Sequence, residues 1–198
     1  KMGTFAQYER EPIKLSDLPD TVPHAVVASE DSSFYTNSGI SPRGIARAVV
    51  NNLRGGHRQG ASTITQQYVE RYYLGTTRGY LGKLKEALLA IKIDQQQSKN
   101  EILENYLNTI YFGSGFYGVH EASVGYFGKE PEELDLPETS MLAGIPNAPS
   151  ELSPFENFIA AKKRQAVVLD TMEAQGLIDA RKAEDAKMQP LNFRPEEH

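Results

Sequence analysis

Two carboxylates mark the part of the sequence that is best suited to chemistry. Glu30 follows the apolar segment Ala25–Ala28 and is followed at once by Asp31. Burial raises the pKa of a carboxyl group, so a carboxylate beside a core is a candidate general base or acid. Glu86 is the second candidate, because enzymes that transfer sugars commonly use two carboxylates.

Between these carboxylates lies a segment, residues 60–67, that supplies small side chains, hydroxyls and primary amides. Buried hydroxyls and amides cost free energy unless each finds a hydrogen-bond partner, so a core element would not have this composition. The surrounding stretch, Ser32–Val69, contains no acid and four arginines: Arg43, Arg47, Arg54 and Arg58. It suits an anionic partner such as a phosphate or a lipid headgroup, or it is a solvated face paired with acids elsewhere.

Together with Lys83-Leu84-Lys85-Glu86-Ala87, these segments resemble the glycosyltransferase domain of class A penicillin-binding proteins and their monofunctional relatives. The resemblance extends over about Ala25 to Met172. It implies an enzyme that polymerises lipid II, a lipid-linked disaccharide, by inverting β-1,4 transfer with release of polyprenyl pyrophosphate. It also implies that Glu30 is the general base on the 4-hydroxyl of the acceptor and that Glu86 orients the pyrophosphate region.

The resemblance also implies substrate-binding residues, in which hydroxyls and amides hold the pyrophosphate and sugar while cations steady the leaving group. These residues are Asp31, Phe34, Gly60, Ser62, Thr63, Gln66, Gln67, Arg78, Lys83, Lys85 and Asn108. A further segment, Arg164-x-x-x-Val168-Leu169, matches a motif that is expected to pack against the core. No metal site or required cofactor is implied, although a divalent cation such as Mg²⁺ could accompany the pyrophosphate.

Four positions depart from the family pattern. Asn37 stands where His is usual, Glu70 where Lys is common, and Gly82 and Ser114 where Arg is common. The last three remove cations from the neighbourhood of a pyrophosphate. We expect Arg78, Lys83 and Lys85 to compensate.

The elements that must position these groups are expected to be nearly all helical. Caps and apolar spacing predict helices from Pro42 up to Gly55-Gly56, from Ser62, at 79–94 and from 99 up to Gly113. Further helices are predicted at 119–126, 137–143 and 156–175, and after Asp179. In the helix at 79–94, Leu81, Leu84, Leu88 and Ile91 share one face, whereas Lys83 and Glu86 share another. Lys83 is therefore expected to lie outside the packing of its helix. Short ribbons are possible at 4–13 and 111–112.

The whole chain of 198 residues, with 39% hydrophobic residues and a net charge of −5, is expected to form a single domain. We expect a mainly α, lysozyme-like fold of two lobes, with Glu30 in a central cleft, the segment Ile40–Asn52 facing a membrane and a loosely ordered tail at 188–198. No run of 18 apolar residues could form a transmembrane helix.

The resemblance implies a place at the outer face of the bacterial cytoplasmic membrane, with an anchor outside this sequence. The expected partners are lipid II, the nascent glycan strand and the membrane surface, with a transpeptidase domain in the complete protein and no nucleic acid.

Two other functions remain open. One is a lysozyme-type glycan hydrolase, since such folds also use a catalytic Glu in a cleft, although hydrolysis of an uncharged glycan does not require clustered cations. The other is a non-catalytic module that binds glycan or lipid, which the missing cations suggest.

Overall fold

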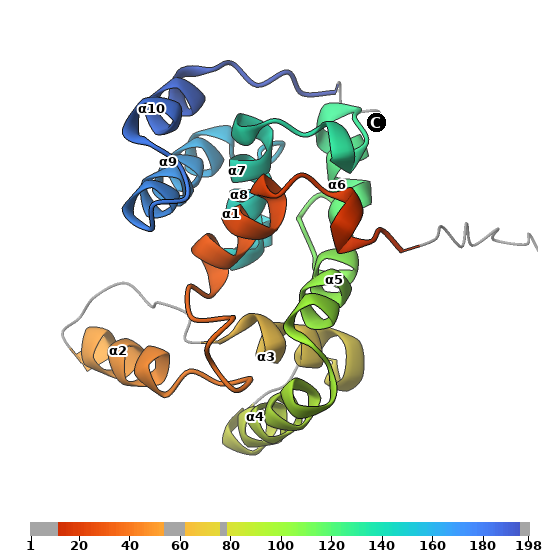
Figure 1. The fold of residues 1–198 in the computed structure, drawn as a ribbon, viewed down its shortest axis with the longest axis vertical. Coiled ribbons are helices and arrows are strands. Elements are labelled where there is room, and N and C mark those ends of the chain that lie inside the picture. Colours follow the sequence, from red (N-terminus) through yellow and green to blue (C-terminus); the bar gives the residue numbers. More distant parts are fainter. Residues whose placement is uncertain (1–11, 54–61, 76–78, 195–198) are drawn as a thin grey trace, which may run out of the picture.

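The computed structural model describes residues 12–53, 62–75 and 79–194, and this part of the chain contains helices and no β-strand (Figure 1). The longer helices are α1 (Thr21–Glu30), α2 (Pro42–Leu53), α4 (Gly79–Gln96), α5 (Lys99–Thr109), α6 (Val119–Phe127), α7 (Leu136–Gly144), α9 (Phe158–Ala174) and α10 (Ala180–Met188). The shorter ones are η1 (Leu15–Asp17), α3 (Ile64–Val69), the π-helical turn η2 (Glu70–Leu74), η3 (Pro131–Glu133), η4 (Ile145–Asn147) and α8 (Pro149–Leu152). The predicted mainly α fold is confirmed.

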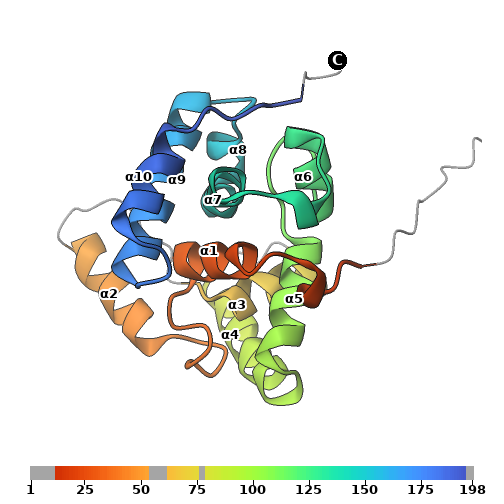
Figure 2. The same cartoon turned by 45° about the horizontal axis from the view of Figure 1, so that its top comes forward.

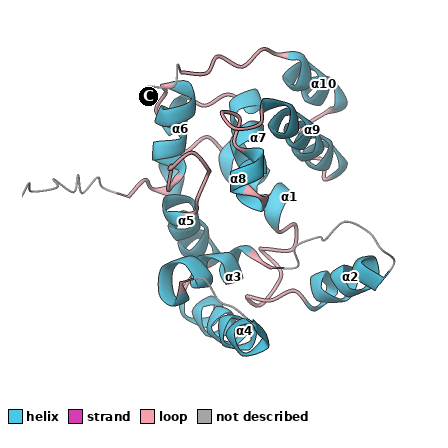
Figure 3. Cartoon of the chain, turned by 180° about the vertical axis from the view of Figure 1, so that it is seen from behind, coloured by secondary structure: helices cyan, strands magenta, loops and turns pink. Residues whose placement is uncertain are grey.

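The helices form two groups, which are seen from different sides in Figures 1 and 2. In one group α1, α7 and α9 pack on one another, and α8 and α10 pack against α9. In the other group α3 packs against α4, α5 and η2. Helix α5 continues toward α6, which contacts α7 and so joins the two groups. Seen from behind, α2, α3 and α4 lie at the end of the molecule away from α9 and α10 (Figure 3).

Local capping explains where several helices begin. A capping box formed by Thr63 and Gln66 starts α3, one residue after the predicted cap at Ser62. The predicted capping box of Ser98 and Glu101 starts α5. Helix α5 ends at Thr109, four residues before the predicted end at Gly113. The predicted ribbon near 111 is a single isolated bridge between Tyr111 and Tyr117, and the ribbon at 4–13 falls largely outside the described residues.

Helix α1 was not anticipated as a helix from its apolar run. The helix ends at Glu30. Its buried side chains are small or branched: Val22, Ala25, Val26, Val27 and Ala28. The loop that follows α1 is tied to α4 at Gly39, where φ is +82° and an added Cβ would lie 2.5 Å from the carbonyl oxygen of Ala90. Only glycine fits there, which fixes the path from the end of α1 to the start of α2.

The orientation predicted for α4 is wrong. Leu81, Leu84 and Leu88 do share a face, but that face is exposed to solvent. The exposed fractions of these three residues are 77%, 56% and 60%. The buried residues of α4 are instead Glu86, Ala90 and Ile93. Periodicity defines which residues share a face and cannot define which face the rest of the fold covers. Among the described helices, none is long and apolar enough to cross a bilayer.

Candidate active site

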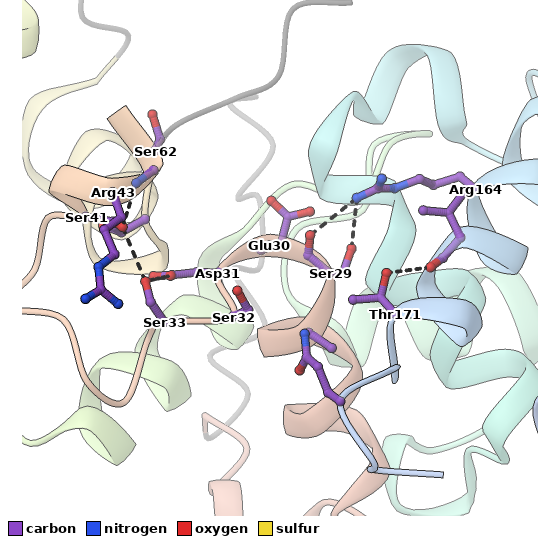
Figure 4. A pocket seen from close by; sticks show the side chains of 15 residues that line it. Ser29, Glu30, Asp31, Ser32, Ser33, Ser41, Arg43, Ser62, Arg164 and Thr171 are labelled. Atoms are coloured by element: carbon purple, nitrogen blue, oxygen red, sulfur yellow. Dashed lines mark hydrogen bonds between the residues drawn. The ribbon is translucent and has the colours of Figure 1, made fainter. Parts of the chain in front are cut away.

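A cavity of about 500 Å³ lies between the two helix groups. Its walls come from the end of α1 and the loop after it, the start of α2, the residues that cap α3, and one side of α9 (Figure 4). Polar side chains dominate the lining: Ser29, Glu30, Asp31, Ser32, Ser33, Ser41, Arg43, Ser62, Thr63, Arg164, Thr171 and Gln175. The predicted central cleft is therefore present, and Glu30 lies in it as predicted.

Gln67 holds one carboxylate oxygen of Glu30, and the other oxygen is buried without a hydrogen-bond partner among the described residues. Its Oε2 accepts a hydrogen bond of 3.0 Å from Nε2 of Gln67. Its Oε1 is buried and has no hydrogen-bond partner within the described part of the chain. Burial raises the pKa of the Glu30 carboxyl group, and the charge of Asp31 adds to this rise. The hydrogen bond from Gln67, the charge of Arg164 and the side chain of Ser29 lower the pKa without cancelling the effect of burial. The result is a fixed carboxylate with a raised pKa and one unused acceptor.

Gln67 is itself fixed from the opposite side. The hydroxyl of Tyr106, which is completely buried in α5, donates a hydrogen bond of 3.1 Å to Oε1 of Gln67. This contact leaves the amide nitrogen of Gln67 facing Glu30. A chain of hydrogen bonds therefore runs from α5 through α3 to the end of α1.

The adjacent Gln66 holds the second carboxylate. Nε2 of Gln66 lies 3.3 Å from Oε1 of Glu86, and Nζ of Lys83 lies 2.7 Å from Oε2 of Glu86, whose side chain is fully buried. Lys83 also lies 3.6 Å from Oε2 of Glu70. Partial burial lowers the pKa of Lys83, but the hydrogen bond and charge of Glu86 and the charge of Glu70 raise it overall. Neighbouring glutamines of α3 thus secure Glu30 and Glu86 separately, and Glu86 does not line the cavity.

Asp31 ties the loop after α1 to the start of α3. Its carboxylate accepts hydrogen bonds from Ser33 Oγ at 2.9 Å, Asn37 Nδ2 at 2.9 Å and the backbone N–H of Ile64 at 3.2 Å. Asn37 in turn accepts a hydrogen bond of 3.2 Å from Lys99, which also pairs with Asp94. The cation next to this loop is therefore Lys99 of α5, and Asn37 links it to Asp31.

The other predicted substrate-binding residues have different surroundings. Phe34 is fully buried beneath Lys99, whose Nζ lies 4.9 Å from the ring centroid. Asn108 bonds the backbone of Ile13 through both its amide oxygen, at 3.0 Å, and its amide nitrogen, at 2.9 Å. Lys85 is exposed on α4. Substrate contact by Phe34, Asn108 and Lys85 stays a prediction.

Ser62 and Thr63 line the cavity, and Thr63 also donates a hydrogen bond of 2.6 Å to the carbonyl of Gly39. Gly60 and Arg78 lie outside the described residues.

Several cavity residues were missed in the sequence. Arg43, which the sequence placed in the basic stretch but not among the substrate-binding residues, lines the cavity from the start of α2. Arg164, Val167 and Thr171 line it from α9, with Gln175 directly after that helix. The residues of α9 recur at three- and four-residue intervals, so they share one helix face. That spacing was a usable signal, but Arg164 was assigned with its motif to the core. Val168 and Leu169 are buried as predicted, whereas Arg164 reaches the cavity.

Comparison with known proteins gives concordant results. Residues 1–173 match the family described as Transglycosylase. The chain is 42% identical over 193 residues to penicillin-binding protein 1A of Neisseria flavescens, covering 97% of this chain and 24% of that protein. It is also 42% identical over 184 residues to penicillin-binding protein 2D of Bacillus subtilis, covering 92% of this chain and 27% of that protein.

Among solved structures, penicillin-binding protein 1A of Haemophilus influenzae matches 93% of this chain and 18% of that one. The TM-score is 0.58 and the sequence identity 26%. The chain thus spans about a quarter of the length of the curated relatives that it matches.

Proposed function

The chain belongs to the transglycosylase family of peptidoglycan glycosyltransferases, and we propose that it polymerises lipid II with Glu30 as the general base. The observation that carries the proposal is the carboxylate of Glu30 in the cavity, held by Gln67 at one oxygen and left with an unused acceptor at the other. A raised pKa brings a carboxyl group closer to the operating pH, which suits a general base.

The proposed reaction is a single displacement. The acceptor's 4-hydroxyl oxygen forms a bond to the anomeric carbon of the donor as its proton passes to Oε1 of Glu30. The bond between that carbon and the pyrophosphate oxygen breaks, and the electron pair leaves with the polyprenyl pyrophosphate. Attack from the face opposite the leaving group converts an α-linked donor into a β-1,4 linkage.

The leaving group carries negative charge and calls for cations more than for a general acid. Arg43 lines the cavity beside Ser62 and belongs to the segment without acids. Lys83, by contrast, is already paired with Glu86 and Glu70. We therefore assign Arg43 the contact with the pyrophosphate in the cavity, and Lys83 the task of securing Glu86.

The test is to incubate the protein with purified lipid II and to resolve the products on a gel, which distinguishes this proposal from its alternatives. A ladder of glycan strands is the expected result. Cleavage of preformed glycan without any ladder would identify a hydrolase instead, and binding of lipid II without either product would identify a non-catalytic module.

The exposed face of α4 supports a place at a membrane surface. Lipid II keeps its long tail in the bilayer, so the cavity has to lie close to that surface. Three leucines and Tyr80, which is 96% exposed, give α4 an exposed apolar face, and Tyr72 and Tyr73 of η2 are also exposed. The predicted membrane-facing helix α2 also exposes Ile45 and Val50. We propose that α4 inserts into the interface alongside the basic segment that contains α2.

Vesicle binding tests this placement. Leu84→Gln together with Leu88→Gln is expected to weaken binding to anionic vesicles about tenfold or more, because two apolar side chains no longer enter the interface. The matched control is Ile159→Gln, an equally exposed apolar residue of α9. If only Arg47→Glu with Arg54→Glu weakens binding, docking depends on the basic segment alone and the α4 assignment is wrong.

The curated relatives are about four times as long as the segment they share with this chain. We propose that the complete protein has a transpeptidase domain and a membrane anchor, and that it works at the outer face of the bacterial cytoplasmic membrane. Mg²⁺ dependence stays a prediction; the described residues contain no group of three or more His, Cys, Asp or Glu side chains placed to hold a metal ion.

A further inference from the structure

We propose that Arg164 is a positioning residue that locks the last turn of α1 and sets the electrostatic environment of the Glu30 carboxylate. The proposal rests on the assignment of Glu30 as the general base. Arg164 comes from the middle of α9, 135 residues along the chain from Ser29, and its side chain reaches across the cavity wall to α1 (Figure 4).

The first argument is the contact with the end of α1. Nη2 of Arg164 lies 3.1 Å from Oγ of Ser29 and 3.4 Å from the Ser29 carbonyl oxygen. The last carbonyls of a helix lack partners within the helix and carry partial negative charge, so a cation at this end is stabilising. Because Glu30 is the next residue, a guanidinium anchored on Ser29 fixes the backbone from which the carboxylate projects.

The second argument is that Gly144 leaves the space that the side chain of Arg164 occupies. Gly144, the last residue of α7, lies against the aliphatic part of Arg164: an added Cβ at Gly144 would lie 2.8 Å from Cγ of Arg164. A larger residue there would displace the arginine. The side chain is thus guided between α7 and α1 toward the cavity rather than into solvent.

The third argument is the balance of charges around Glu30. Within the described part of the chain, Arg164 is the positive group whose charge lowers the pKa of Glu30, against burial and the charge of Asp31. Two other groups face this region: Arg43, which lines the same cavity from the start of α2, and Tyr106, which is buried behind Gln67 and has Arg71 near it. Without Arg164, burial and Asp31 would act on Glu30 with only hydrogen bonds opposing them.

The fourth argument is that one hydrogen-bond donor of Arg164, its Nε–H, is left unpaired by the packing of the described residues. Its Nε–H is buried and, within the described residues, makes no hydrogen bond. Buried donors of purely structural side chains are nearly always paired. An unpaired Nε–H in the wall of the same cavity as the unpaired Oε1 of Glu30 is consistent with a role at the reaction site.

The test is the pH dependence of lipid II polymerisation by the 198-residue chain and its Arg164→Met variant, which keeps the aliphatic bulk and removes the charge. The base has to be ionised, so activity rises with pH through the pKa of Glu30. Loss of the cation raises that pKa and moves the acid limb of kcat/KM to higher pH. The comparison is made at the pH where the wild-type kcat/KM is half of its alkaline plateau. At that pH, the kcat/KM of the variant, as a fraction of its own plateau, is expected to be about threefold or more lower than that of the wild type. Arg164→Lys is expected to restore most of the wild-type profile.

Lys163→Met, at the exposed neighbouring position of α9, is the matched control and should leave the profile unchanged. A uniform loss of activity in Arg164→Met with an unshifted acid limb would show that Arg164 only packs, and would overturn the proposal. The carboxyl resonance of Glu30, followed by ¹³C NMR and identified by its absence in Glu30→Gln, gives a readout independent of turnover. If the chain makes no glycan but this resonance titrates at higher pH in Arg164→Met, the proposed function fails while the Arg164 assignment holds. An unshifted resonance refutes the assignment whatever the activity.

Discussion

Glu30→Gln is expected to lower the rate of lipid II polymerisation by about 10²–10⁴-fold, the usual cost of losing a general base. An amide has no lone pair basic enough to take the proton of the attacking hydroxyl. It can still accept the hydrogen bond from Gln67 at its carbonyl oxygen, so the geometry of the cavity should persist.

The stability of this variant provides the control for folding. A carboxyl group whose pKa is raised by folding binds protons more tightly in the folded state, so its charged form destabilises that state at pH values above its pKa. A neutral glutamine removes this cost, and the melting temperature should stay the same or rise. Glu132→Gln, at an exposed position, should affect neither activity nor melting. Near-native turnover by Glu30→Gln would refute the assignment of the base.

Lys83→Ala is expected to lower stability as well as activity, contrary to the expectation from the sequence that Lys83 lies outside the packing of α4. The substitution removes the 2.7 Å contact to Glu86, whose side chain is fully buried. A hydrogen bond to a charged group contributes about 1.5–3 kcal/mol, and Lys83 is half exposed, so the lower end of that range applies. For a chain of this size that corresponds to a fall of about 3–6 °C in melting temperature.

Lys85→Ala is the matched control for stability alone, because Lys85 lies on the same helix and is exposed. A second comparison isolates the cause. In a Glu86→Gln background the buried charge is gone, so Lys83→Ala should cost much less stability than it does in the wild type. Equal costs in both backgrounds would mean that Lys83 stabilises α4 through something other than Glu86.

Local signals in the sequence were sufficient for most of the helices. Ser98 with Glu101 and Asp179 each accept hydrogen bonds at the starts predicted from residue type alone, and Gly176 has the positive φ expected after α9. The face of α4 was mispredicted because an apolar stripe in a sequence does not show whether the rest of the fold covers it or leaves it exposed. The burial of Glu86 could not be predicted, because its contact with Gln66 of α3 forms only in the folded structure.

The site was predictable to the extent that its residues lie in short motifs. Glu30, Ser62 and Thr63 were found in this way and line the cavity. Arg164 was missed as a cavity residue because its motif was assigned to the core, and its contact with Ser29, 135 residues away, could not be predicted from the sequence. The distinction between Gln66 and Gln67 also needed the structure, since both look alike in a run of polar residues.

The placement of these two glutamines on one six-residue helix makes the two ends of the site interdependent. Gln67 contacts Glu30, the proposed base, and Gln66 contacts the buried carboxylate of Glu86 beside Lys83, so a rotation of α3 changes both contacts at once. Two ligands that bind near Glu30 and near Glu86 are then thermodynamically linked through α3. The factor by which one ligand changes the affinity of the other equals the factor in the opposite direction. If Glu30 is the base, as proposed, a ligand that displaces this helix removes the Gln67 hydrogen bond and inhibits the enzyme without contacting Glu30.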